Sequence, residues 1–367
     1  MESLYIHIPF CTQICSYCDF HREIANPQKK KAYINALKHE LWYFKPRLNN
    51  LKTIYIGGGT PTALSPAMLA DFLAFLNEHI NMAQIKEFTI EANPKDITET
   101  MAILFKKYHI NRISLGAQSF DDALLKLLRR NHEAKDIFHA IDMLNRHELH
   151  NISLDMIFAL PTQTMNMLKK DLKTLMHLKI KHISYYSLIL EPKTRLYHAV
   201  QKGQQRLPGE EIEAAMFEEI IESLSNASFK QYEISSFSKA SPSLHNTLIW
   251  QDGDYLGIGS GAHSKYDNTR YGNLPRLKTY LEVMTEARLP PRESYPYENK
   301  RDFLLMGMRL LKGVSLKTYQ TRYHCDFFTD YPNLRPLLDQ GFLVLKNDHL
   351  ALSQKGMMVG NEIFKLF

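Results

Sequence analysis

Three cysteines near the start of the chain are the residues best suited to chemistry. Cys11, Cys15 and Cys18 follow a C-x3-C-x2-C pattern inside LYIHIPFCTQICSYCDF, directly after an apolar segment. Thiolates are soft ligands that hold iron–sulfur clusters, and such clusters usually take four cysteines. A compact trio therefore predicts a cluster with one iron open to a further ligand.

Two other interpretations of these cysteines stay open from spacing alone. A zinc site would need a fourth ligand, which His7 or His21 could supply. The alternative is three unrelated thiols in a reducing cytosol. Cys325, the fourth cysteine, lies far along the chain beside His324, so we leave it out of the site. This distribution argues against a disulfide framework.

The composition is that of a compact globular protein with one large and one smaller domain. The chain has 367 residues, of which 44% are hydrophobic and 23% charged. Its formal charge of +6 is spread along the chain and is weak evidence for nucleic-acid binding. No apolar run is long enough for a membrane helix, and Met1-Glu2-Ser3 lacks the basic start of a signal peptide. We therefore expect a cytoplasmic protein with no integral membrane segment.

Short β-rich segments alternate with helical patterns through the first half of the chain, which predicts βα units around a parallel sheet. The expected strands are residues 4–9, 53–56, 87–90, 112–115, 152–158 and 182–190. Helices are expected to open at Asn26-Pro27 and at Ser65-Pro66. Six units are fewer than a complete barrel needs, so we predict an incomplete (β/α)6 barrel, open on one side, in preference to a flat doubly wound sheet.

The remainder of the chain predicts two further parts. We expect residues 1–200 to form the partial barrel, 201–295 an extension that covers it, and 296–367 a small winged-helix-like α+β domain with a turn at Asn347-Asp348. This domain lacks a basic stripe, which favours packing or protein contact over DNA binding. Gly257, Gly259 and Gly261 are compatible either with close backbone approach to a ligand or with a tight strand edge or turn.

Polar and glycine residues follow the predicted strands, where a parallel barrel carries its chemistry. An open iron could chelate the amino and carboxylate groups of S-adenosylmethionine, whose reductive cleavage yields a 5′-deoxyadenosyl radical. The backbone from Gly57 to Thr60 could approach such a ligand closely. Groups that could hold its ammonium, ribose and carboxylate are Glu91, Gln118, Asp155 and Arg130. Each of these residues, taken singly, could equally be a surface or helix-capping residue.

Motifs along nearly the whole chain carry a family resemblance. They are YIHIPFCTQICSYCDF, IGGGTPT, IEANP, SLGAQSF, LDMIFALP, HNTLIW and YLGIGSGAHS. The chain resembles the radical S-adenosylmethionine family that contains oxygen-independent coproporphyrinogen III dehydrogenases and the HemW-type haem chaperones. The resemblance implies a 4Fe-4S cluster on Cys11, Cys15 and Cys18. It further implies that S-adenosylmethionine is surrounded by Tyr5, Tyr17, Gly58, Gly59, Thr60, Glu91, Gln118, Arg130 and Asp155. Arg130 has a second arginine, Arg129, directly before it.

Two features resemble the chaperone branch of this family. Only ten residues precede Cys11, and Phe20 stands where the dehydrogenase has a fourth cysteine. The resemblance implies a protein that binds haem, delivers it to acceptor haemoproteins and takes electrons for its cluster from a donor. The alternative is the enzyme, which decarboxylates two propionates of coproporphyrinogen III oxidatively. A nucleic-acid modifier has little support from charge.

One short motif points to a haem ligand. His245, Asn246 and Trp250 match the HN-xx-aromatic-W motif of the chaperones, but Ile249 stands where an aromatic residue is usual. Imidazole is a normal axial ligand of haem iron, so His245 is the candidate ligand. A structural histidine is the equal alternative.

Overall fold

The computed structural model describes residues 1–286 and 292–367 of the chain. Its centre is six parallel strands that lie side by side in chain order within a larger sheet of twelve. These strands are β1 (Ser3–Ile8), β2 (Thr53–Gly58), β3 (Glu87–Ala92), β4 (Arg112–Gln118), β5 (Ile152–Phe158) and β6 (His182–Ser187). A flat doubly wound sheet would reverse its strand order near the middle, so the sequential order agrees with the expected partial barrel.

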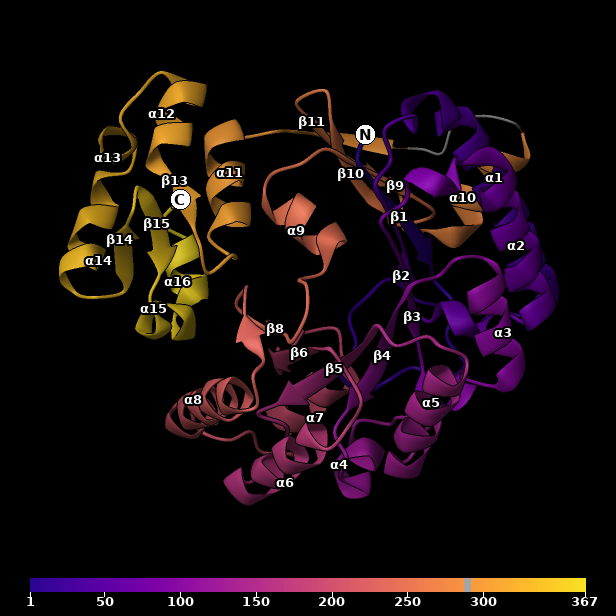
Figure 1. Ribbon diagram of the computed structural model, residues 1–367, viewed down its shortest axis with the longest axis horizontal. Coiled ribbons are helices and arrows are strands. Elements are labelled where there is room, and N and C mark those ends of the chain that lie inside the picture. Colours follow the sequence, from indigo (N-terminus) through magenta and orange to yellow (C-terminus); the bar gives the residue numbers. More distant parts are fainter. Residues whose placement is uncertain (287–291) are drawn as a thin grey trace.

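Helices cover the outer side of this curved sheet (Figure 1). They are α1 (Pro27–Phe44), α2 (Pro66–His79), α3 (Glu99–Lys107), α4 (Asp122–Leu127), α5 (Ala134–Arg146), α6 (Met165–Met176), α7 (Arg195–Gln201) and α8 (Glu210–Asn226). The side chains of Asn26 and Ser65 accept hydrogen bonds from Lys29 N and Met68 N, which confirms both expected helix starts. Every helix in the described parts of the chain is too short or too polar to span a bilayer.

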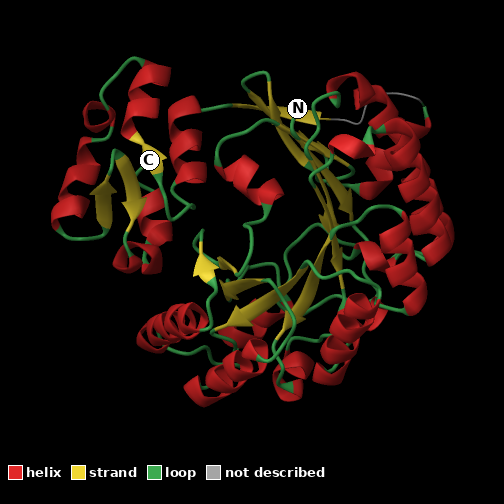
Figure 2. Ribbon diagram, viewed as in Figure 1, coloured by secondary structure: helices red, strands yellow, loops and turns green. Residues whose placement is uncertain are grey.

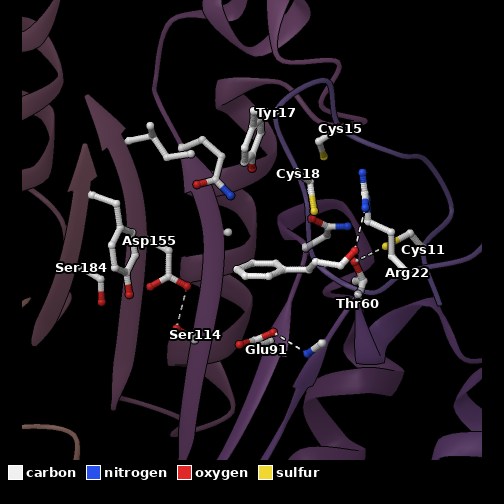
Figure 3. Close-up of a pocket in the computed structure, with 18 of the residues that line it drawn as sticks. Cys11, Cys15, Tyr17, Cys18, Arg22, Thr60, Glu91, Ser114, Asp155 and Ser184 are labelled. Carbon is white, nitrogen blue, oxygen red and sulfur yellow. Dashed lines mark hydrogen bonds between the residues drawn. The ribbon is translucent and has the colours of Figure 1, made fainter. Parts of the chain in front are cut away.

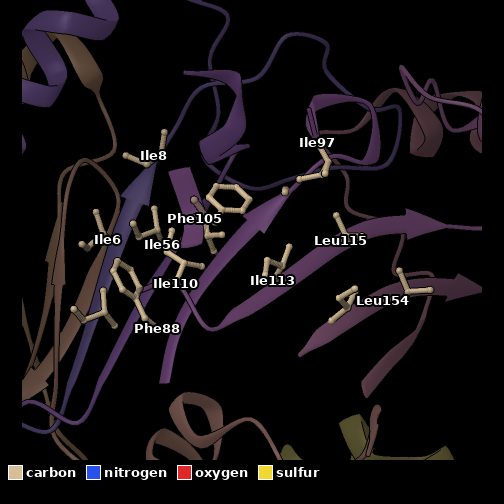
Figure 4. Close-up of a cluster of buried hydrophobic side chains, with 14 of the residues drawn as sticks. Ile6, Ile8, Ile56, Phe88, Ile97, Phe105, Ile110, Ile113, Leu115 and Leu154 are labelled. Carbon is tan, nitrogen blue, oxygen red and sulfur yellow. The ribbon is translucent and has the colours of Figure 1, made fainter. Parts of the chain in front are cut away.

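The core lies between the strands and these outer helices. Figure 4 shows Ile6, Ile56, Phe88 and Ile113 gathered on one side of neighbouring strands, and all four are at most 1% exposed. Burying each such side chain stabilises the fold by roughly 1.5–3 kcal/mol. Because side chains alternate across a strand, the residues between them point to the inside of the barrel. That inner face is where the polar residues of the motifs lie.

Residues after α8 extend the sheet at both edges. Their elements are β7 (Lys230–Gln231), β8 (Ser236–Ser238), α9 (Leu244–Trp250), β9 (Tyr255–Ile258), β10 (His263–Tyr266), β11 (Thr269–Asn273), α10 (Leu277–Thr285) and β12 (Arg292–Pro296). Strand β8 pairs with β6, and β9 pairs with β1. Helix α9 packs against β1 and β2. The domain limits expected from the sequence stay a prediction.

The glycines around β9 serve packing. A Cβ at Gly257 would lie 2.0 Å from the carbonyl oxygen of His263, and one at Gly259, where φ is +101°, would lie 2.5 Å from the hydroxyl of Tyr33. Both positions therefore need glycine because the chain itself approaches closely. The tight strand edge, one of the two interpretations left open by the sequence, is the one that the structure shows.

The C-terminal part has its own small sheet and core (Figure 2). Its elements are α11 (Asn299–Gly307), β13 (Val314–Ser315), α12 (Leu316–Tyr323), α13 (Phe327–Asp330), α14 (Arg335–Asp339), β14 (Leu343–Lys346), β15 (His349–Leu352), α15 (Gln354–Met358) and α16 (Gly360–Phe364). The turn between β14 and β15 is formed by Asn347 and Asp348, both with positive φ, as a tight hairpin requires. This arrangement of helices with a β-hairpin wing confirms the winged-helix-like prediction.

Candidate functional site

The cysteine loop and the ends of β2 to β6 enclose a cavity of about 480 Å³ (Figure 3). All three cysteines line it, together with Tyr17, Gly58, Gly59, Thr60, Glu91, Gln118, Arg130 and Asp155. The structure thus brings together every predicted cofactor residue except Tyr5. The hydroxyl of Tyr5 instead lies 3.0 Å from Nδ1 of His7, outside the lining of this cavity.

The cysteine loop is fixed by backbone hydrogen bonds to distant segments. Ser16 N donates to Leu128 O at 3.0 Å, and Thr60 N donates to Phe10 O at 2.8 Å. Cys11 Sγ lies 3.7 Å from the hydroxyl of Thr60. Burial raises the pKa of Cys11 to about 11 and also raises the pKa of Cys18, so both free thiols keep their protons at neutral pH. Binding of a metal would displace those protons, as thiolate ligation requires.

The structure does not favour the zinc alternative. Both ring nitrogens of His7 are engaged, Nδ1 with the Tyr5 hydroxyl and Nε2 with His21 O at 2.9 Å, and Nε2 of His21 lies 3.1 Å from Ser260 Oγ. Among the described residues, no three His, Cys, Asp or Glu side chains converge closely enough to hold a single metal ion. Figure 3 shows the three cysteines at the same end of the cavity, where they could ligate a larger group such as a cluster.

Two glycines leave room for the loop and its ligand. A Cβ at Gly59 would lie 2.8 Å from Phe10 O and 3.0 Å from Cys11 Sγ. Gly58 has φ of +119°, and a Cβ there would lie 2.7 Å from the ring of His7. A side chain at either position would therefore displace the cysteine loop or the histidine beside it.

Two carboxylates face the cavity from β3 and β5. Glu91 accepts hydrogen bonds from the Tyr55 hydroxyl at 2.8 Å and from Gly58 N at 3.1 Å. Asp155 accepts from Ser114 Oγ at 2.8 Å. Burial raises the pKa of Glu91 to about 7 and that of Asp155 to about 6. A cationic or hydroxyl-bearing ligand would stabilise the ionised form of both carboxylates, because it would replace the interactions with water that are lost on burial.

Arg130 lies between the cysteine loop and the strand ends. Its Nη1 donates to Cys15 Sγ at 3.2 Å, and its Nη2 donates to Gly116 O at 2.8 Å and to Asn93 Oδ1. Its Nε is buried without a partner among the described residues. The neighbouring Arg129 is exposed, although it also lies at the cavity wall. The geometry therefore favours Arg130, which is half-buried, over the exposed Arg129 as the cation of the site.

Gln118 reaches the cavity through an irregularity of β4. The pairing of β4 with β5 shifts register between Gly116 and Gln118, and Gln118 has φ of +68°. A bulge of this kind redirects a side chain at the end of a strand. Its amide nitrogen would lie 3.0 Å from a Cβ at Gly116, so the glycine makes room for it.

The candidate haem ligand lies at the opposite end of the barrel. His245, on α9, is 2% exposed, its Nδ1 lies 2.9 Å from Thr53 Oγ1, and its ring packs on Tyr55. Its helix neighbour Asn246 lines the lower part of the cavity. Trp250, at the end of α9, lies under the guanidinium of Arg309.

The fourth cysteine, Cys325, lies in the C-terminal domain, where its Sγ donates a hydrogen bond to Asp330 at 2.9 Å.

The sequence motifs do not point to several of the residues that line the cavity. These residues are Arg22 in the cysteine loop, Asn93 after β3, and Arg112, Ser114, His182 and Ser184 on the inner face of β4 and β6. The signal for the last four was present in the sequence, since residues 112 and 114, and 182 and 184, alternate with apolar neighbours. Once the facing side of a strand is known, this alternation places them inside the barrel.

The incomplete barrel and its cysteine site define a protein of the radical S-adenosylmethionine class. A sequence model described as "Radical SAM superfamily" matches residues 5–175, and one described as "HemN C-terminal domain" matches residues 298–359. The solved coproporphyrinogen III oxidase HemN from Escherichia coli covers 99% of this chain, and this chain covers 89% of it, with a TM-score of 0.83 and 22% identity. At that identity the likeness concerns the fold alone.

Curated relatives match over the full chain. The heme chaperone HemW of Bacillus subtilis is 37% identical to this chain, and the match covers 100% of this chain and 99% of the relative. The heme chaperone HemW of Lactococcus lactis is 35% identical, and the match covers 100% of this chain and 97% of the relative. A mitochondrial radical S-adenosyl methionine domain-containing protein 1 from Bos taurus is 32% identical over 97% and 85%. The chain belongs to the HemW family. Membership of the radical S-adenosylmethionine superfamily implies a 4Fe-4S cluster and S-adenosylmethionine, and the cavity described above has the residues to hold both.

Proposed function

We propose that the chain is a haem chaperone that binds a 4Fe-4S cluster, S-adenosylmethionine and haem, and passes haem to acceptor haemoproteins. The observation that carries this proposal is the full-length similarity to proteins named heme chaperone HemW in bacteria as distant as Bacillus subtilis and Haemophilus influenzae. Phe20, which is 72% exposed at the edge of the cavity, supports it, because a fourth cysteine is expected there in the dehydrogenase.

The residues of the cavity have separate roles in this proposal. Cys11, Cys15 and Cys18 hold the cluster. Glu91 and Asp155 accept hydrogen bonds from the ammonium and ribose hydroxyls of S-adenosylmethionine, and Arg130 faces its carboxylate. When bound, cluster and S-adenosylmethionine together supply one-electron chemistry at the sulfonium. The protein keeps that chemistry inside the barrel, away from solvent.

The role of His245 in haem binding requires a conformational change. Burial lowers its pKa to about 3, so the imidazole is neutral, which is the form that binds iron. In the structure, however, the ring is packed between Thr53 and Tyr55. As an axial ligand it would become available only when α9 moves away from β1 and β2. A haem that binds at the outer surface would not need His245.

Haem titration of the full chain tests the proposal. We expect the anaerobically reconstituted protein to bind haemin in a fixed stoichiometry and to transfer it to a purified apo-haemoprotein, followed by the absorbance of the acceptor. The His245→Ala variant should bind haem more weakly while its cluster absorbance stays unchanged. A protein that neither retains haem nor transfers it would contradict the proposal.

The same preparation distinguishes the chaperone from the enzyme, whose fold the chain shares. We expect no conversion of coproporphyrinogen III when the cluster is reduced and S-adenosylmethionine is present. Rapid turnover to protoporphyrinogen would show that the dehydrogenase alternative is right. The Cys15→Ser variant serves as the control in both assays, since it should lose the visible absorbance of the cluster.

A further inference from the structure

The lower end of the cavity forms a chamber that the cluster and S-adenosylmethionine do not need. It lies beneath Asp155, between the starts of β4 and β6 and the first turn of α9. We call this region the lower chamber; its walls are Arg112, His182, Ser184, Ser243 and Asn246. All of its strand residues point inward for the same reason as Glu91 and Asp155, because side chains on one strand face the same side at every second position.

Arg112 in the lower chamber is a buried cation that forms no ion pair in the part of the chain that the structure describes. It is 3% exposed, and the one hydrogen bond that its side chain forms within residues 1–286 and 292–367 is a long one, from Nη1 to Asn151 Oδ1 at 3.4 Å. Its guanidinium forms no ion pair with a carboxylate of these residues, and Asp155 is affected by it only through space. A buried charge left without a partner is strongly unfavourable, so a guanidinium in this position calls for an anion.

The carboxylates on neighbouring strands are engaged elsewhere. Glu87, at the start of β3, accepts hydrogen bonds from Leu244 N at 2.8 Å and His245 N at 2.9 Å, and so holds the start of α9. Asp155 accepts from Ser114, and Arg112 acts on it only through space by opposing the rise of its pKa. These groups therefore leave the hydrogen-bonding capacity of Arg112 available to a ligand.

His182, beside Arg112, does not compete for that anion. Burial lowers its pKa well below the usual range, so it is neutral, and its two ring nitrogens lie 2.8 Å from Ser153 Oγ and 2.8 Å from the Tyr232 hydroxyl. The lower chamber thus offers a single planar cation among neutral polar groups. Such a guanidinium matches a carboxylate in a bidentate geometry. The two half-buried acids above it, Glu91 and Asp155, disfavour a more highly charged phosphate.

We propose that Arg112 binds a carboxylate of a ligand that reaches past the S-adenosylmethionine site into the lower chamber. The same cavity is lined at the end of β6 by Tyr186, Leu188 and Ile189, of which Ile189 is 64% exposed. These side chains offer surface to an apolar body, while Arg112 takes its acidic arm. This inference rests on the proposed function, and under that function the carboxylate is a propionate of haem.

Comparing haemin with its dimethyl ester tests the inference, because esterification removes the negative charge and leaves the macrocycle. The cluster-loaded full chain should bind haemin about tenfold more tightly than the ester, as one charge-assisted contact predicts. Arg112→Gln should bind the two forms equally well and keep its cluster absorbance and its affinity for S-adenosylmethionine. Arg112→Lys should keep part of the preference. Arg146, an exposed residue of α5, gives the matched control Arg146→Gln, which should bind like the parent.

The outcomes separate this inference from the proposed function. Equal binding of haemin and ester by the unmodified protein overturns the inference, and so does a preference that survives in Arg112→Gln. A protein that binds neither form contradicts the proposed function instead. Arg112→Gln without ligand should unfold at no lower temperature than the parent, since no ion pair is lost. A clear loss of stability in that variant would show that the arginine serves the fold, and would overturn the inference.

Discussion

Arg130 donates a hydrogen bond from Nη1 to Cys15 Sγ at 3.2 Å, and this contact joins the segment after α4 to the cysteine loop. The same guanidinium donates to Gly116 O at 2.8 Å and to Asn93 Oδ1, at the ends of β4 and β3. The cysteine loop is therefore held against two strand ends by one half-buried cation. Its position relative to Glu91 and Gln118 depends on that side chain.

Arg130→Gln should lower the affinity for S-adenosylmethionine, because the amide carries no charge to pair with the carboxylate of the ligand. Hydrogen bonds to charged groups contribute about 1.5–3 kcal/mol, so the dissociation constant should rise by roughly ten- to hundredfold. Equilibrium dialysis with the cluster-loaded protein measures it. The neighbouring Arg129→Gln is the control and should bind normally, since Arg129 is exposed. Equal effects of the two changes would contradict the assignment of Arg130.

Gly59→Ala should impair cluster binding without unfolding the barrel. The added methyl group would lie 3.0 Å from Cys11 Sγ and 2.8 Å from Phe10 O, so the cysteine loop must shift. Overpacking of this kind costs about 1–3 kcal/mol. Iron and sulfide content per chain gives the measurement, and circular dichroism checks the fold. Gly209→Ala, where a methyl group meets nothing within 4 Å, should bind a full cluster; full loading of Gly59→Ala would show that the loop adapts.

Much of the barrel could be predicted from the sequence because its strands are short apolar runs with clear ends. The segment 152–158 was predicted with the limits that β5 has. Strands β2, β3 and β4 continue two or three residues beyond their expected ends, through Gly58, Glu91 and Gln118. Backbone hydrogen bonds hold a parallel strand whatever the side chain, so pairing continues where apolar character stops. The site residues consequently lie on the strands as well as after them.

Other features depend on contacts that no local pattern contains. The pairing of β9 with β1 joins residues some 250 positions apart, and nothing in DYLGIGSGAHS names that partner. The segment HNTLIW forms most of helix α9. His245 of this helix is buried against Thr53 because Glu87 accepts hydrogen bonds from the backbone amides at the start of the helix. The alternation of Arg112 with apolar neighbours is visible in the sequence, but it does not say which side of the strand faces inward. A strand-initial arginine is usually exposed, and only the closed inner face of the barrel makes it buried.

The affinity for S-adenosylmethionine should depend on the ionisation of Glu91. Its pKa is raised to about 7 by burial, so the carboxylate is largely protonated at pH 6 and largely ionised at pH 8. A protonated acid does not pair with the ammonium of the ligand, and the affinity should therefore fall about tenfold from pH 8 to pH 6. Calorimetric titration at several pH values measures this. Because the amino group of the ligand also titrates, the parent is compared with Glu91→Gln. The affinity of that variant should not show the fall between pH 8 and pH 6 that Glu91 causes.

Glu222→Gln provides the matched control for that experiment. Glu222 is an exposed residue of α8 outside the cavity, so this variant should follow the pH dependence of the parent. If Glu91→Gln and the parent show the same pH profile, then Glu91 does not contact the ammonium. Asp155, with a pKa raised to about 6, would then be the group to replace next.

Asp252→Asn should loosen the attachment of the C-terminal domain. The side chain of Asp252 is 1% exposed and forms ion pairs with Lys265 of β10 at 2.6 Å and with Arg322 of α12 at 2.8 Å, and it also accepts a hydrogen bond from the Tyr297 hydroxyl. Removing its charge leaves the buried ammonium of Lys265 with only the more distant carboxylate of Asp254, at 3.9 Å, so the loss should approach the roughly 3–5 kcal/mol of a broken buried ion pair. We expect a lower urea midpoint and faster proteolysis between β12 and α11.

The control Glu362→Gln removes an ion pair between two exposed side chains, Glu362 at 70% and Lys365 at 68% exposure. That change should alter the free energy of unfolding by less than about 0.5 kcal/mol. If Asp252→Asn proves equally mild, then the C-terminal domain is held by its apolar contacts and not by this buried carboxylate.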